Sequence, residues 1–228
     1  MRPGNGGGGG GQVWYASYGS NMSVGRLAYY VTGGRPPGGS LTYPGARDAR
    51  MPVRSQAVEL PGTVYFATES VAWTGGRAFY DPDVAGVVWA RAHLVTVGQF
   101  SDIAAQEMYR APGRDLDLGA VLADGRARLG PGRYETLVYP GDVGGIPLLT
   151  FTAPWGVADV EWTRPAAAYL RFLASGLLEA GAWDVAAVAG YLAARPGAAG
   201  HWTAADIRSL LDTPVTPPAH PDPDPRRN

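Results

Sequence analysis

The chain has 228 residues, of which 46% are hydrophobic and 17% charged, and its formal net charge is −1. This length and composition predict one globular domain with a sizeable core, and the charge excludes a strongly basic surface for nucleic acid or anionic lipid. The absence of cysteine excludes disulfides, thiolate nucleophiles and zinc sites built on sulfur. All 19 basic residues are arginine, which, with 33 glycines and 20 prolines, indicates a GC-rich genome of the actinobacterial type.

The two ends of the chain differ from its middle. Residues 1–13 carry a glycine tract and residues 213–228 are rich in proline, so we expect two disordered tails around a folded domain at 14–212. No apolar run approaches the roughly 20 residues that a membrane-spanning helix needs, and glycine stands where a signal peptide would have its apolar stretch. We therefore expect a cytoplasmic protein with no membrane partner.

Branched and aromatic runs separated by Gly, Pro and Asp predict strands in the first two thirds of the chain. These strands are expected at residues 13–17, 63–70, 77–81, 86–95, 133–141 and 147–153. Apolar residues at helical spacing predict helices from Thr163 to Gly181 and over 183–194, and Thr203 with Asp206 forms a capping box that begins a third. Strands followed by helices favour an α+β fold with a helical C-terminal third.

The first strand ends on a small polar turn, Tyr18–Gly19–Ser20–Asn21. One interpretation is a β-turn in which Gly19 supplies a positive φ. The other is a binding loop, because a tight turn at a strand end exposes consecutive backbone N–H groups that bind a carboxylate or an oxyanion. Tyr18 and Asn21 could add side-chain donors. These four residues alone leave both interpretations open.

A short helix within residues 98–110 carries the candidate base. Ser101 is expected to cap this helix, and Asp102, Ala105 and Tyr109 are expected to point away from its apolar stripe. The apolar stripe consists of Phe100, Ile103, Ala104 and Glu107. Moving a carboxylate from water to an apolar face costs free energy, so such a residue is expected to have a charged partner or a catalytic role. Glu107 is therefore either a structural carboxylate paired with an arginine or a general base whose pKa is raised by burial.

Other candidate residues are few. Gly75 and Gly76 mark a hairpin bend or bulge, or a place where a substrate approaches the backbone closely. The 3 histidines, His93, His201 and His220, have no metal-ligand spacing, and His93 alternates with apolar neighbours as on one face of a strand. The chain lacks a G-x-S-x-G elbow and a Walker lysine, so we expect neither a metal nor a nucleotide cofactor.

Several of these stretches together resemble one family. "YASYGSNM" is similar to the YGSN signature of the γ-glutamyl cyclotransferase-like superfamily, and "WTGGRAFYDPDVAGVVWARAHLVT" to its glycine-pair hairpin and following G-x-[VL]-W strand. "DIAAQEMY" matches the place of the family's catalytic glutamate, and "PAAAYLRFLASGLLEAG" resembles its C-terminal helix, so the resemblance covers about residues 14–195. The chain departs from the family at Ala16 and Ser17, where many relatives have an aromatic residue and alanine, and at residues 110–133, which form an insertion.

The resemblance implies a small mixed β-barrel with flanking helices, in which Glu107 is the general acid/base. It implies that the loop formed by Tyr18, Gly19, Ser20, Asn21 and Met22 binds the α-amino acid end of a γ-glutamyl substrate, and we add Gly75 and Gly76 to this binding site. Such an enzyme cyclises a γ-glutamyl amide or dipeptide to 5-oxoproline and a free amine, without a metal or other cofactor. The insertion beside Glu107 leaves the choice of leaving amine open.

Two other functions stay open on the same residues. One is an amidohydrolase, acyl transferase or deacylase that acts on a specialised metabolite or a modified lysine. The other is a non-catalytic module whose loop captures an amino acid or a peptide end. The product separates the three, because cyclisation gives 5-oxoproline, hydrolysis gives free glutamate and a binding module gives neither. The oligomeric state is also left open.

Overall fold

The computed structural model describes residues 11–36, 42–70 and 74–212. The two tails expected at 1–13 and 213–228 lie outside these residues, apart from Gly11, Gln12 and Val13. Strand β1 begins at Gln12, which pairs with Thr96 of a neighbouring strand. The ordered strand therefore starts two residues before the predicted domain boundary.

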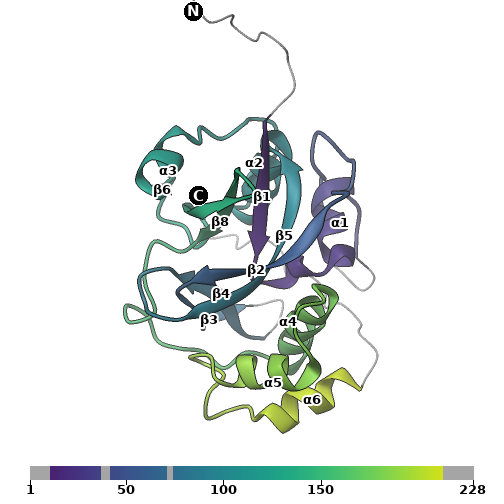
Figure 1. Cartoon of the computed structure of the whole chain (residues 1–228), viewed down its shortest axis with the longest axis vertical. Helices are drawn as coiled ribbons and strands as arrows, with labels where there is room; N and C mark the ends of the chain where they lie inside the picture. The colour runs from purple at the N-terminus through teal and green to yellow at the C-terminus, as the bar shows by residue number, and fades with distance from the viewer. Residues whose placement is uncertain (1–10, 37–41, 71–73, 213–228) are drawn as a thin grey trace, which may run out of the picture.

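A six-stranded sheet forms the centre of the molecule, in the order β2-β5-β1-β8-β7-β6 (Figure 1). Its strands are β1 (Gln12–Ser17), β2 (Ser55–Pro61), β5 (Val87–Thr96), β6 (Arg126–Arg128), β7 (Thr136–Val143) and β8 (Ile146–Thr152). Strand β1 runs antiparallel to β5, where Trp14 lies opposite Leu94, and parallel to β8, where Trp14 lies opposite Leu148. The first strand of the chain is thus an inner strand of the sheet.

A separate antiparallel hairpin pairs β3 (Thr63–Ser70) with β4 (Gly75–Asp81). The helices are the 3-10 turn η1 (Ser20–Met22), α1 (Val24–Thr32), α2 (Val97–Glu107), α3 (Gly119–Asp124), α4 (Ala167–Glu179), α5 (Val185–Ala193) and α6 (Ala204–Leu211). Helices α4, α5 and α6 gather at one end of the molecule, whereas α2 and α3 lie at the other (Figure 1). In the described part of the chain, no helix has the length and apolar character that crossing a membrane requires.

The side chains of β1 alternate between two apolar clusters, as expected for a strand buried on both faces. Trp14 packs in the cluster that contains Leu173 of α4, whereas Tyr15 packs in the cluster that contains Phe100 of α2. Both clusters are built from buried side chains, which supply the main stabilising free energy of such a core. The sheet therefore holds α4 and α2 on opposite sides of the strand that leads into η1.

The α+β class and the helical C-terminal third are confirmed. Closure into a barrel is not confirmed, because among the described residues the outer strands β2 and β6 pair only with β5 and β7. Each of the six predicted strands and three predicted C-terminal helices has a counterpart, and the capping box of Thr203 with Asp206 is present.

Two predicted helix starts are wrong. Helix α2 begins at Val97, because Thr96 caps it in a capping box with Gln99, and Ser101 instead donates from Oγ to Val97 O. Helix α4 begins at Ala167, because the backbone before it lies along the β3–β4 hairpin and donates from Thr163 N to Phe66 O.

Candidate active site

A cavity lies at the end of β1, where the chain turns into η1. It is lined by the loop Tyr18–Asn21 and by side chains from α1, from the end of α2, from β4 and from the segment that precedes β7. Its charged lining residues are Arg26, Arg77, Glu107 and Arg133. The cavity thus joins the predicted binding loop and the predicted base.

The turn after β1 is a single 3-10 turn. Met22 N donates to Gly19 O over 3.1 Å and Ser23 N donates to Ser20 O over 3.2 Å. Gly19 itself has φ −115° and ψ −152°, so the interpretation that it supplies a positive φ is wrong. The reason is that the strand enters the turn in an extended conformation, which any residue can adopt.

Glu107, the last residue of α2, faces the cavity and is half-buried. Asn21 donates from Nδ2 to Glu107 Oε1 over 3.0 Å, and the Tyr30 hydroxyl also forms a hydrogen bond with this carboxylate. The same Asn21 Nδ2 lies 3.3 Å from the Tyr15 hydroxyl. Three elements, η1, α1 and α2, therefore fix one carboxylate at the wall of the cavity.

Burial raises the pKa of Glu107 above its ordinary value. The hydrogen bond from Tyr30 and the positive charge of Arg26 oppose this rise without cancelling it. Among the described residues, no arginine or histidine forms an ion pair with Glu107. These features favour a proton acceptor over a structural carboxylate held by an arginine.

Three arginines of the cavity were not among the predicted site residues. Arg26 of α1 is 8% exposed, and its guanidinium lies 5.3 Å from the ring centroid of Tyr30 and 4.8 Å from that of Tyr43. Arg77 comes from β4 and Arg133 from the segment before β7. A sequence with 19 basic residues, all arginine, gives no local signal that singles out these three.

Three of the predicted binding residues lie outside the cavity lining. The Met22 side chain is buried in the core, and its carbonyl accepts from Arg91 Nη1 over 3.1 Å. Gly76 N donates to Arg164 O over 2.8 Å, and a Cβ at Gly76 would lie 2.1 Å from Thr163 O. A Cβ at Gly75 would lie 2.7 Å from both Arg164 O and Ala166 N. The absence of a side chain at both glycines therefore lets the backbone before α4 pack against β4.

Comparison with known proteins gives few and distant matches. No protein-family model matches the chain. Histone deacetylase 5 of Arabidopsis thaliana is 31% identical over 189 residues, which are 74% of this chain and 28% of that protein. The chain thus spans little more than a quarter of the curated relative that it matches.

The solved structures to which the chain is similar include a γ-glutamyl cyclotransferase, of the family that the sequence resembles. That structure is 15% identical with a TM-score of 0.46, over 88% of this chain and 98% of the other. An uncharacterised human protein is 14% identical with a TM-score of 0.47, over 89% and 99% of the two chains. YkqA of Bacillus subtilis is 17% identical with a TM-score of 0.38, over 74% and 49%.

His93 forms a hydrogen bond with the backbone of the loop at Asn21. This side chain of β5 is 1% exposed, and its Nε2 lies 3.1 Å from Asn21 O. Because a carbonyl oxygen only accepts, Nε2 carries the hydrogen and donates. Burial lowers the pKa of His93 to about 4, so the ring is neutral near pH 7. Among the described residues, no three His, Asp or Glu side chains are grouped so that they could hold a metal ion.

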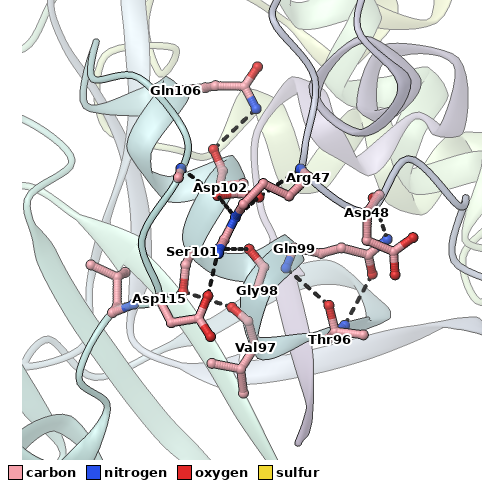
Figure 2. Close-up of polar contacts among 12 residues, drawn as sticks. Arg47, Asp48, Thr96, Val97, Gly98, Gln99, Ser101, Asp102, Gln106 and Asp115 are labelled. Carbon is pink, nitrogen blue, oxygen red and sulfur yellow. Dashed lines mark hydrogen bonds and ion pairs between the residues drawn. The ribbon is translucent and has the colours of Figure 1, made fainter. Parts of the chain in front are cut away.

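Helix α2 is fixed by a network around Asp102 (Figure 2). The Asp102 side chain is fully buried and accepts from Arg47 N over 2.9 Å, from Arg47 Nε over 3.0 Å and from Gly113 N over 3.1 Å. Gln99 Nε2 adds hydrogen bonds to Asp48 O and Arg50 O. Asp102 was expected to point away from the apolar stripe, and the segments around Arg47 and Gly113 bury this second face of the helix as well. This network positions the helix that ends in Glu107.

Proposed function

We propose that the chain is an enzyme that cyclises a γ-glutamyl amide or dipeptide to 5-oxoproline and a free amine. The observation that carries this proposal is the Glu107 carboxylate, which has a raised pKa and faces a cavity beside the loop Tyr18–Asn21. A general base for an amine needs a pKa raised towards the working pH and access to the reacting atoms. The resemblance of the sequence to γ-glutamyl cyclotransferases supports the same activity.

The reaction needs no nucleophilic side chain. The substrate's own α-amine attacks its γ-carbonyl carbon, so the new C–N bond closes a five-membered ring and the old amide C–N bond breaks. The attacking ammonium loses two protons as it becomes the N–H of the ring. Glu107 accepts the first and delivers it to the departing nitrogen, and the second also passes to this nitrogen, so the amine leaves as an ammonium ion. Holding the substrate bent raises the effective concentration of the amine at the carbonyl, and donors in the loop stabilise the oxyanion.

The roles of the remaining residues follow from their contacts. Asn21 and Tyr30 orient the Glu107 carboxylate through hydrogen bonds. Arg26, which is nearly buried beside Tyr30, supplies a positive charge for the substrate α-carboxylate. His93 holds the backbone of Asn21 and so acts through the loop.

The test is an identification of products. The purified chain is incubated with a panel of γ-glutamyl amides and dipeptides, and 5-oxoproline and glutamate are quantified by mass spectrometry. Formation of 5-oxoproline that is lost in Glu107→Gln and kept in Glu161→Gln, a control at an exposed carboxylate, supports the proposal. Glutamate as the product would establish a hydrolase, and an acetyl-lysine peptide in the panel tests a deacylase such as the name of the plant relative suggests. Binding without any product would establish a non-catalytic module.

A further inference from the structure

A second cavity lies beside the candidate active site, further along the same strands. Ala78 of β4 and Thr150 of β8 line the first cavity, whereas Tyr80 and Thr152, two residues further on, line the second. The two linings have no residue in common. The second cavity has a volume of about 350 Å³, within the range of roughly 300 to 1,000 Å³ that is typical of small-molecule sites. It therefore has room for a ligand of its own.

One wall of the second cavity is a row of side chains across three strands. Arg128 of β6 lies opposite Thr136 of β7, and Thr136 lies opposite Thr152 of β8. All three residues line the cavity. Thr152 Oγ1 accepts from Tyr80 N over 3.0 Å and donates to Tyr80 O over 2.7 Å, so this hydroxyl is fully occupied. The row places the side chain of Thr136 on the same face as its two neighbours.

Two buried polar groups of this lining have no hydrogen-bond partner in the described part of the chain. They are Oγ1 of Thr136, a residue that is 2% exposed, and Nε1 of Trp155, in the segment that follows β8. A buried hydroxyl or N–H group without a partner costs free energy. Both groups therefore point to a ligand that brings hydrogen-bond acceptors.

The second cavity also presents fixed acceptors. The carboxylate of Asp81, a residue that is 5% exposed, accepts from Asp83 N over 2.9 Å and from Val157 N over 2.8 Å. The carboxylate of Asp159 accepts from Gly156 N over 2.9 Å. Among the residues that the structure describes, neither carboxylate forms an ion pair. Because an ionised carboxylate has about four acceptor sites, both can also accept from a ligand.

The charges of this lining nearly cancel. The carboxylates of Asp81, Asp83 and Asp159 are joined by the guanidinium groups of Arg126 and Arg128. Arg126 Nη2 donates to Asp83 Oδ2 over 2.8 Å. A ligand of either charge would meet like charges as well as opposite ones. A hydroxyl group is neutral and both donates and accepts, so it suits carboxylates and guanidinium groups together.

We propose that the second cavity binds a polyhydroxylated small molecule, such as a sugar. The hydroxyl groups of this ligand donate to Asp81 and Asp159 and accept from Arg128 and Thr136. Its C–H groups pack against the ring of Trp155, because small-molecule sites combine apolar walls with a few polar groups. This site is independent of the proposed function, since no step of the cyclisation uses these residues.

The test follows the indole N–H signal of Trp155 in the isotope-labelled full-length protein by nuclear magnetic resonance. The signal is assigned by its absence in Trp155→Phe. The probes are glucose, galactose, mannose, ribose and myo-inositol, and glycine, ethylammonium and acetate are the charged comparisons. We expect at least one polyhydroxylated probe to shift this signal with saturation, and the charged probes to leave it in place.

Asp159→Asn and Arg128→Gln should each weaken this binding about 10-fold, because each removes a charged hydrogen-bond partner. Both residues are exposed, so the variants should fold, which melting curves check. Two control variants should leave the binding unchanged. Glu59→Gln removes an exposed carboxylate from β2, at the opposite edge of the sheet from β6, and Glu107→Gln alters the first cavity.

A shift caused by the charged probes and by none of the polyhydroxylated ones would overturn the inference. The absence of a shift with every probe would also overturn it and would mean that the cavity holds only water. Binding that both Asp159→Asn and Arg128→Gln leave unchanged, or that Glu107→Gln abolishes, would contradict the assignment to the second cavity. Failure to form 5-oxoproline contradicts the proposed function and leaves this site intact.

Discussion

Asn21 donates from Nδ2 to Glu107 Oε1 over 3.0 Å, although 86 residues separate the two along the chain. Asn21 lies in η1 directly after β1, and Glu107 ends α2. The Tyr15 hydroxyl, 3.3 Å from the same amide nitrogen, provides a second polar contact that orients Asn21. The contact therefore ties the position of the candidate base to the conformation of the candidate binding loop.

Replacing Glu107 by glutamine removes the proton acceptor and keeps an oxygen that can accept from Asn21. We expect turnover to fall by about 10² to 10⁴. The melting temperature should stay level or rise, because a neutral amide avoids the desolvation of the half-buried carboxylate. Single-turnover assays and thermal melts on one preparation measure both. A destabilised variant with near-normal turnover would contradict the assignment of Glu107.

The raised pKa of Glu107 also predicts two pH dependences. A general base must be ionised, so kcat/KM should fall as the pH falls through this pKa, with a midpoint above the ordinary value of 4.5. Because the native state holds the proton more tightly than the unfolded state, the stability that protonated Glu107 contributes is lost as the pH rises through the same pKa. Urea denaturation across this range should show Glu107→Gln gaining stability relative to the native chain as the pH rises.

His93 predicts a loss of stability in acid. Its pKa is lowered from 6.5 to about 4 by burial, so between these values the unfolded state binds a proton that the native state does not. The free energy of unfolding should therefore decrease as the pH falls from about 6.5 to 4, by on the order of 3 kcal/mol from this residue. Denaturation of His93→Gln should lack this component, whereas replacing the exposed His201 in the same way should keep it.

Arg47 binds one buried and one exposed carboxylate, which gives a matched pair of variants. The side chain of Asp102 is fully buried, whereas that of Asp115, 2.5 Å from Arg47 Nη2, is 57% exposed. Asp102→Asn replaces one acceptor oxygen with an NH2 group, which would face the donors of Arg47 and Gly113. This change should cost about 2 to 4 kcal/mol of unfolding free energy. Asp115→Asn should cost less than about 1 kcal/mol, because water screens an exposed pair. Equal losses in urea denaturation would show that Asp102 does not hold α2.

Two glycines predicted to bind substrate should respond differently to alanine. A Cβ at Gly76 would lie 2.1 Å from Thr163 O, so Gly76→Ala must push away the backbone that precedes α4 and should cost at least about 2 kcal/mol. A Cβ at Gly19 would meet only the Tyr169 hydroxyl at 3.7 Å, so Gly19→Ala should change stability by less than about 0.5 kcal/mol. Thermal melts of the two variants compare them directly, and a large loss at Gly19 would show that the turn is more constrained than its geometry indicates.

The elements that the sequence predicted are those with a strong local pattern. Strand β5 carries branched and aromatic residues, and α6 begins at a capping box. Strand β2 was missed because "SQAVELP" is a mostly exposed outer strand that pairs only with β5. Helix α1 was missed because "VGRLAYYVT" mixes glycine with residues that favour strands. It is helical in the fold because Leu27 and Val31, four residues apart, both pack into the core.

The candidate site was predictable only in part, for a related reason. Asn21 and Glu107 belong to stretches with a recognisable pattern, and the structure brings them together. Arg26, Arg77 and Arg133 come from three distant segments, and only the packed fold makes them neighbours of one cavity. The periodicity of α2 identifies one apolar face, and it gives no sign that a second segment covers the other face, which carries Asp102.

The inner position of β1 has a consequence for the order of folding. Trp14 can pair with Leu94 only when β5 has been made, and with Leu148 only when β8 has been made. A strand whose neighbours both lie far along the chain is costly to place early, because the long loops must close before any pairing compensates for the lost entropy. We expect β1 to stay unpaired on the nascent chain until β5, which ends at Thr96, has been synthesised, and to lack its second neighbour until β8, which ends at Thr152, has followed. The loop at Asn21, which continues directly from β1, should then be among the last parts to reach its native shape.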